Sequence, residues 1–162
     1  MMGLDRNNRV NIRKIPKRRT KVPRWVAAEK LIGRLLAELL LDGFIVLNDV
    51  PFPYGNLDHL VIRSKGTIFL IETKSQRGKV TWDGKQLLIN GNPFPSNPIC
   101  QINRSIRWVR KMVQQLSGRN PWIVSVLVFP NAQVFMPHSI KRINIMSSEN
   151  LLSFVRYYPE LP

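Results

Sequence analysis

The sequence predicts an α/β fold in which a mixed central β-sheet is flanked by helices. Two segments carry apolar residues at helical spacing, one after Pro23 and one after Pro98, and each is followed by a glycine. Several short segments with the composition of strands lie between them. A continuous apolar run, residues 123–129, follows the second helical segment and is typical of a central strand covered on both faces.

The first helix is expected to begin after Pro23 and to end near Gly43, a typical C-cap residue. Its apolar positions recur at helical spacing: Trp25, Ala28, Ile32, Leu35, Leu36 and Leu39. Residues 44–47 are then predicted to form a buried strand. Residues 51–56 have the proline, glycine and asparagine content of a loop.

Two strands, residues 57–63 and 67–75, are predicted to pair through a three-residue turn that ends at Gly66. Gly66 can take the left-handed conformation that such a turn requires, so Arg63 should face Thr67. This turn fixes the register of the two strands, and a slip by one residue would move every side chain to the opposite face.

The remaining elements follow from similar signals. A hairpin across 79–82 and 87–89 should turn near Asp83-Gly84, and a helix should then be opened by Asn97-Pro98 and ended by Gly118. A central strand over 123–129 and a short strand over 143–146 are expected next. A last helix, capped by Ser147 or Ser148, should bear Leu151, Leu152 and Val155. The apolar face of the second helix comprises Ile102, Ile106, Val109, Val113 and Leu116.

The chain has 162 residues and a formal net charge of +15, which suits one domain with a polyanionic partner. Residues 1–24 carry nine basic side chains against the single acid Asp5. We expect them to form a flexible basic arm, followed by a single domain over residues 25–162. The arm is either a nucleic-acid-binding tail or a solubilising tail. Its assigned nucleic-acid contacts are Arg13, Lys14, Lys17, Arg18 and Arg19.

Charge alone leaves DNA, RNA and anionic membranes as candidate partners. No convincing basic amphipathic helix supports a membrane surface, and the longest apolar runs are far shorter than the ~20 residues that cross a bilayer. No signal peptide is visible. Cys100 is the only cysteine, which agrees with a reducing, cytoplasmic location, and two histidines leave little material for a zinc site.

Glu72 is notable because it follows the apolar residues 68–71 in a segment that should form a buried strand. A buried charge costs free energy unless it is paired or binds a metal ion. Glu72 and Lys74 are two residues apart, so both side chains point to the same side of the sheet. The two residues are therefore either a buried ion pair or part of a catalytic site.

Asp58 begins the preceding strand, and the turn at Gly66 places it opposite Glu72 on the same side of the sheet. Two facing carboxylates repel each other unless positive charge lies nearby, and either Lys74 or Mg²⁺ could supply that charge. A metal ion held by Asp58 and Glu72 would polarise a phosphodiester and lower the pKa of a bound water. Lys74 would orient that water or stabilise charge on the phosphorus.

The residues around this motif are similar to those of a known family. The stretch from Gly55-Asn56-Leu57-Asp58 through Ile71-Glu72-Thr73-Lys74 to Gly78 resembles the nuclease-related domain, which belongs to the PD-(D/E)XK superfamily. Further similar elements are Ala28-Glu29, the segment 42–49, and Asn92-Pro93 or Asn97-Pro98 followed by Gln101. The resemblance covers roughly residues 25–130, and Ala28 stands where the family usually has glycine.

The resemblance implies a restriction-endonuclease-like core and a nuclease that uses Mg²⁺ or Mn²⁺ to cut DNA. It implies that Asp58, Glu72 and Lys74 form the catalytic core, with Asp58 and Glu72 as metal ligands. Glu29 would reach in from the first helix as an additional metal or water ligand; otherwise it is an exposed glutamate that favours the helix dipole. Gln101 would lie near the scissile phosphate; otherwise it is a simple polar residue of the first turn.

The second helix carries Arg104, Arg107 and Lys111 on one flank, where they could follow a phosphate backbone or form only a solvated face. His59 should point away from Asp58 and pack in the core. The principal alternative to a nuclease is a nucleic-acid-binding module of the same fold with little or no cleavage. A third possibility is an interaction domain whose basic surface docks an acidic partner.

Overall fold

Six strands form the main sheet of the computed structural model, which describes residues 21–159. In spatial order they are β1 (Ile45–Phe52), β2 (Gly55–Ile62), β3 (Thr67–Thr73), β7 (Trp122–Phe129), β10 (Ile143–Ser147) and β9 (Ser139–Ile140). The pairs β3–β7 and β7–β10 are parallel and the other three pairs are antiparallel, so the sheet is mixed. The predicted fold class is confirmed.

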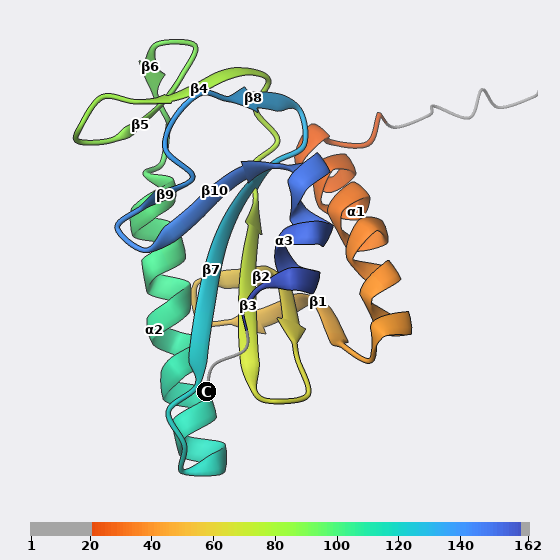
Figure 1. Cartoon of the computed structure of the whole chain (residues 1–162). Coiled ribbons are helices and arrows are strands. Elements are labelled where there is room, and N and C mark those ends of the chain that lie inside the picture. Colours follow the sequence, from red (N-terminus) through yellow and green to blue (C-terminus); the bar gives the residue numbers. More distant parts are fainter. Residues whose placement is uncertain (1–20, 160–162) are drawn as a thin grey trace, which may run out of the picture.

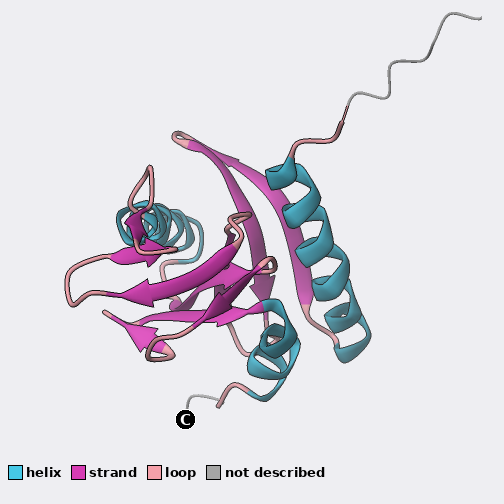
Figure 2. Cartoon of the chain, turned by 90° about the horizontal axis from the view of Figure 1, so that it is seen from above, coloured by secondary structure: helices cyan, strands magenta, loops and turns pink. Residues whose placement is uncertain are grey.

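Helices cover both faces of this sheet, as Figures 1 and 2 show. One face carries α1 (Arg24–Leu36), the 3₁₀ helix Ala37–Asp42 and α3 (Leu151–Tyr157), which follows a 3₁₀ turn at Ser148–Asn150. The other face carries α2 (Pro98–Ser117). Among residues 21–159, no helix is long and apolar enough to cross a membrane.

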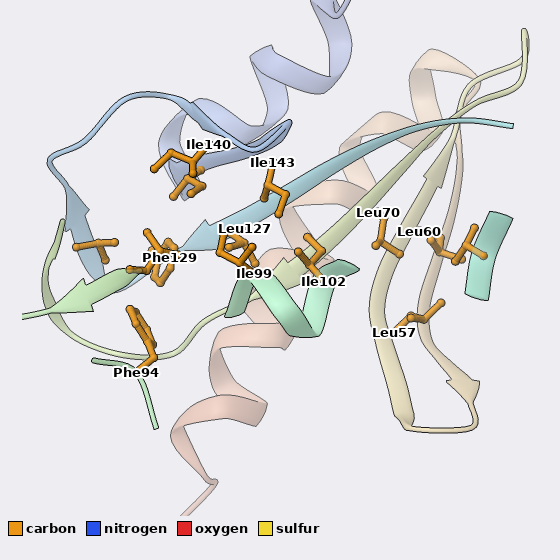
Figure 3. Close-up of a cluster of buried hydrophobic side chains, with 14 of the residues drawn as sticks. Leu57, Leu60, Leu70, Phe94, Ile99, Ile102, Leu127, Phe129, Ile140 and Ile143 are labelled. Carbon is orange, nitrogen blue, oxygen red and sulfur yellow. The ribbon is translucent and has the colours of Figure 1, made fainter. Parts of the chain in front are cut away.

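The side chains of β3 contribute to the hydrophobic cores on both faces of the sheet, because successive side chains of a strand point to opposite faces. Ile68 and Leu70 pack on the α2 side, in the cluster drawn in Figure 3, whereas Phe69 and Ile71 pack on the α1 side. All seven residues of β3 are buried. Any polar side chain placed on this strand is therefore held in a rigid and largely dry position.

A second, smaller sheet lies beyond the carboxyl end of β3 (Figure 1). It contains β6 (Asn92–Pro93), β5 (Leu87–Ile89), β4 (Gly78–Trp82) and β8 (Ala132–Val134). The hairpin of β4 and β5 was predicted, but β6 and β8 were not. The short β8 pairs in parallel with β4, from which it is distant in sequence, so no local pattern announces it.

The predicted register between β2 and β3 is confirmed. Gly66 has a φ of +90°, the Arg63 N–H donates to the Thr67 carbonyl over 3.0 Å, and His59 pairs with Ile71. Both ends of α2 are also as predicted, because the Asn97 side chain accepts hydrogen bonds from its first turn and Gly118 is a left-handed C-cap. Gly43 is a left-handed C-cap too, but it ends the 3₁₀ helix, since α1 itself ends at Leu36.

Several details of the prediction are wrong. The strand expected at residues 44–47 is longer and mostly exposed, because β1 is the edge strand of the sheet. The loop expected at 51–56 is only a two-residue turn at Pro53-Tyr54. Trp25 and Leu116 fit their helical patterns but are 58% and 81% exposed, since each lies near a helix end where the sheet no longer covers it.

The last helix is held by an arginine and not by a serine cap. Ser147 precedes the turn that leads into α3, but its hydroxyl bonds to Glu149 and caps no backbone N–H. Arg63 is buried and donates hydrogen bonds to the carbonyls of Val155, Arg156 and Tyr158. A cation suits these carbonyls because the C-terminal end of a helix is partially negative.

Candidate active site

Glu72 and Lys74 lie at the carboxyl end of β3, where the sheet meets the first turn of α2 (Figure 1). Glu72 is only 6% exposed, because β2 and β7 flank its strand and α2 covers its face. Lys74 follows directly and keeps the alignment of the strand, since its N–H donates to the Val128 carbonyl over 2.9 Å. Both side chains therefore emerge on the α2 side, as the sequence predicts.

Gln101 completes a triangle with these two residues. The Lys74 ammonium donates to Glu72 Oε1 over 2.9 Å and to Gln101 Oε1 over 2.6 Å. The Gln101 amide in turn donates to Glu72 Oε1 over 2.7 Å. Each side chain is thus fixed by the other two, which holds the lysine nitrogen at a defined point near the Glu72 carboxylate.

Asp58 lies close to Glu72 at the end of the strand pair. His59 and Ile71 are the last directly paired residues of β2 and β3, and just beyond them Asp58 Oδ2 accepts a hydrogen bond of 2.7 Å from the Thr73 N–H and interacts with the charge of Glu72. This backbone contact holds the carboxylate against the end of β3. The sequence predicts the facing pair but not the contact with Thr73.

The electrostatics of the site show how close these acids are. Burial, followed by the negative charge of Glu72, raises the pKa of Asp58 to about 8 in the metal-free protein, although the hydrogen bond from Thr73 acts in the opposite direction. The charges of Glu29 and Lys74 act on Asp58 as well, with opposite signs. A site with this much unbalanced negative charge favours a bound cation.

Glu29 approaches from the second turn of α1, on the other side of an open cavity of about 770 Å³ that Asp58 and Asp49 also line. Partial burial, followed by the charges of Asp49 and Glu72, raises the pKa of Glu29. Glu29 is therefore within electrostatic reach of Glu72 and Asp58. None of the hydrogen bonds within residues 21–159 joins it to either carboxylate.

The donor set fits a hard divalent cation that keeps part of its water shell. Within the described range 21–159, no donor bonds to Asp58 Oδ1 or Glu72 Oε2, so one oxygen of each carboxylate remains available. In the same range, no group of three or more His, Cys, Asp and Glu side chains is arranged to hold a metal ion by itself. Mg²⁺ does not need such a group, because it is commonly bound by one or two carboxylates with waters and substrate phosphate.

Two residues of this cavity were not predicted as site residues. Asp49 has a φ of +57°, a conformation that aspartate tolerates better than most residues, and its carboxylate accepts a 2.6 Å hydrogen bond from Asn56. Asn48 contacts His59 Nδ1 over 2.7 Å. Both residues lie in the edge strand β1, and only the pairing of β1 with β2 brings them to the site.

His59 is a core histidine, as the sequence predicts. It is 2% exposed, and its burial lowers its pKa to about 4, so the ring is neutral at physiological pH. It points toward α1, where Gly33 leaves room for the ring. It therefore supports the floor of the cavity and supplies no positive charge to it.

The predicted nucleic-acid contacts of α2 lie on its exposed flank, where the guanidinium of Arg104 stacks over the Tyr54 ring at 4.9 Å and Arg107 and Lys111 are open to solvent. The contacts predicted in the arm lie outside the described residues: Arg13, Lys14, Lys17, Arg18 and Arg19.

Comparison with known proteins gives one family and two distant structures. The family model described as the nuclease-related domain matches residues 24–130, more than half of the chain. A structure of an EndoMS complex with double-stranded DNA has 16% identity and a TM-score of 0.37 over 82% of this chain. A repair endonuclease from Pyrococcus abyssi has 13% identity and a TM-score of 0.35 over 79%. The match covers 42% of each of those two chains. No curated protein matches the chain.

Proposed function

The chain belongs to the nuclease-related domain family, and on this premise we propose that it is a Mg²⁺- or Mn²⁺-dependent nuclease that hydrolyses phosphodiester bonds in DNA. The observation that carries the proposal is the arrangement at the end of β3, where Asp58 faces Glu72 and Lys74 is fixed between Glu72 and Gln101. A structural ion pair needs Glu72 and Lys74, but it does not need a second buried carboxylate opposite them.

In this proposal Asp58 and Glu72 hold the metal ion, and Glu29 binds it directly or through a water. The ion supplies Lewis-acid polarisation of the phosphodiester and lowers the pKa of a water. Lys74 has three N–H donors, and the two hydrogen bonds to Glu72 and Gln101 leave one for the attacking water or a phosphate oxygen. Gln101 acts through Lys74, because it fixes the direction of the ammonium group.

The backbone of the DNA is proposed to lie along the basic flank of α2 and to be held more tightly by the arm. Arg104, Arg107 and Lys111 start one turn after Gln101 on the same helix, so they extend from the site in one direction. Arg13, Lys14, Lys17, Arg18 and Arg19 would add contacts that are independent of sequence. The single cysteine, Cys100, supports a reducing and cytoplasmic setting for this activity.

Nicking of supercoiled plasmid tests the function and the site together. The wild-type protein should nick the plasmid in Mg²⁺ or Mn²⁺, and both EDTA and Lys74→Ala should abolish nicking. Lys85→Ala, in the exposed turn between β4 and β5, is the matched control and should nick normally. Nicking that survives in Lys74→Ala would show that the site is wrong. Tight plasmid binding without nicking would favour a binding module of the same fold.

Asp58→Ala separates catalysis from binding. This variant should lose cleavage but bind DNA as well as the wild-type protein or more tightly, because a negative charge next to the phosphate is removed. Binding is measured by gel shift in EDTA at pH 9, where no cleavage competes and the Asp58 carboxyl, with its pKa of about 8, is mostly ionised. Melting temperature serves as the control for folding. A folded Asp58→Ala protein that still cleaves would contradict the proposed metal site.

A further inference from the structure

The turn between β1 and β2 meets α2 in a cluster of aromatic and basic side chains, of which the proposed function uses only Arg104. Phe52 packs against Trp108 of α2, with ring centroids 5.6 Å apart, and meets the Tyr54 ring edge-on at 5.8 Å. The guanidinium of Arg104 lies over the Tyr54 ring, 4.9 Å from its centroid. We refer to Phe52, Tyr54, Arg104 and Trp108 as the tip cluster.

The backbone holds the tip cluster rigidly. Phe52 pairs directly with Gly55, so only Pro53 and Tyr54 form the turn. The ring of Pro53 restricts its own φ, and Gly55 has a φ of +124°, which other residues rarely adopt. Tyr54 is thus presented at a fixed position, and little conformational entropy would be lost when it binds a ligand.

Tyr54 is much more exposed than Phe52 and Trp108, which indicates that it does not serve to pack the hairpin. Phe52 and Trp108 are half-buried against the core and suffice to fasten the hairpin to α2. Tyr54 remains 64% exposed even with Arg104 stacked on it. A planar guanidinium on an exposed aromatic ring is a surface on which nucleic-acid bases stack.

The tip cluster is near the proposed catalytic residues. Arg104 follows Gln101 by three residues, so it lies on the same flank of α2 and about 4.5 Å further along the axis. Tyr54 precedes Asp58 by four residues, which is about 13 Å along the strand. A nucleotide within one or two positions of a phosphate at Lys74 could therefore reach the cluster.

We propose that Tyr54 and Arg104 stack an unpaired base beside the phosphodiester to be cleaved, so that the substrate is single-stranded or locally unpaired DNA. This inference rests on the proposed function, because it places the base relative to that site. In a duplex both faces of a base are covered by its neighbours, and exposing one costs a few kcal/mol. An unpaired base can stack on the cluster without that cost.

Binding in EDTA tests the inference without any need for catalysis. The probes are fluorescein-labelled oligodeoxythymidine of about 20 nucleotides and a blunt duplex of the same length, measured by fluorescence anisotropy. The wild-type protein should prefer the single strand. Tyr54→Ala should weaken single-strand binding about tenfold, within the range of one lost base stack, and leave duplex binding unchanged.

Three further variants distinguish stacking from packing. Tyr54→Phe and Tyr54→Trp keep an aromatic ring and should keep the single-strand preference. Tyr54→Leu can still pack against Phe52 but has no aromatic face, so it should behave like Tyr54→Ala even where its melting temperature is that of the wild-type protein. Lys111→Ala is the control for charge and should weaken binding of both probes to a similar degree.

The outcomes also separate this inference from the proposed function. A Tyr54→Leu protein that keeps full single-strand preference, or a wild-type protein that binds duplex more tightly, would overturn the inference. Cleavage is measured separately on circular single-stranded and supercoiled DNA with Mg²⁺ or Mn²⁺. Cleavage without strand preference would leave the nuclease standing and remove the stacking site. Selective binding of the single strand without cleavage of either DNA would support the stacking site and count against the nuclease.

Discussion

Asp58 is buried against Glu72, and this contact makes the free energy of unfolding of the metal-free protein depend on pH. The pKa of Asp58 rises from 3.8 to about 8 on folding, whereas that of His59 falls from 6.5 to about 4. The raised carboxyl pKa stabilises the fold at low pH, and this stabilisation is lost as the pH rises toward 8. The lowered histidine pKa has the opposite effect, which is confined to pH values below about 6.5.

The two effects oppose each other between about pH 4 and 6.5, so of these two groups only Asp58 acts above that range. In EDTA the free energy of unfolding should fall between about pH 6.5 and 8, by at most about 1.4 kcal/mol per pH unit. Asp58→Asn cannot ionise and should remove the fall. Urea unfolding followed by circular dichroism at several pH values measures this. An equal fall in Asp58→Asn would assign it to another group.

Divalent metal provides a second measurement at the same residue. An ion that binds the folded protein alone raises the free energy of unfolding. Mg²⁺ should therefore stabilise the wild-type protein at pH 8, where it replaces the proton on Asp58, and should stabilise Asp58→Asn much less. Ca²⁺ and Na⁺ at matched ionic strength control for screening. Equal stabilisation of both proteins by Mg²⁺ would place the ion elsewhere.

The arrangement of the main candidate site residues could be predicted because it depends on local rules. Alternation puts Glu72 and Lys74 on one side of β3, and one glycine, Gly66, sets the register that brings Asp58 opposite. Asp49 and Tyr54 could not be found in this way. Asp49 depends on β1 continuing past residue 47 beside β2, and Tyr54 depends on its continuing through Pro51 and Phe52, whose proline and aromatic content is equally typical of a loop.

At the scale of elements, three parts of α2 have different surroundings. Its apolar face packs against the sheet through Ile102 and Val109, its first turn holds Gln101 beside Lys74, and its outer flank carries Arg107 and Lys111. Its boundaries were predictable because the Asn97 cap and Gly118 are local signals. Strands β6 and β8 were not, since distant pairing partners define them.

The flank of α2 gives a prediction about salt. Each Lys or Arg that contacts a phosphate adds about 0.9 to the slope of log K against log salt on duplex DNA. Arg107→Gln and Lys111→Gln should each lower that slope by about 1, and together by about 2. Lys85→Gln, in the turn between β4 and β5, is the charge-matched control and should leave the slope unchanged. Equal effects of all three changes would indicate only general attraction by net charge.

At the scale of the whole molecule, the basic residues are distributed unevenly along the sequence. The chain has a formal net charge of +15, and residues 1–20 contribute seven basic side chains and one acid to it. The first helix begins at Arg24, and the two hydrophobic clusters draw on residues from Ile32 onward. Single-domain folding of residues 25–162 and a binding role for the arm are therefore independent expectations that one deletion can test.

Removing residues 1–20 should weaken DNA binding without unfolding the protein. The truncated chain loses no residue of either hydrophobic cluster, so its melting temperature should equal that of the full chain. Its slope of log K against log salt should be several units smaller, because up to seven cationic side chains no longer release counterions. A full-length variant with serine at Arg13, Lys14, Lys17, Arg18 and Arg19 controls for length and should behave like the deletion.

A lower melting temperature in the deletion but not in the serine variant would mean that the arm packs on the domain. An unchanged slope in both would mean that the basic face of the domain holds the DNA without the arm.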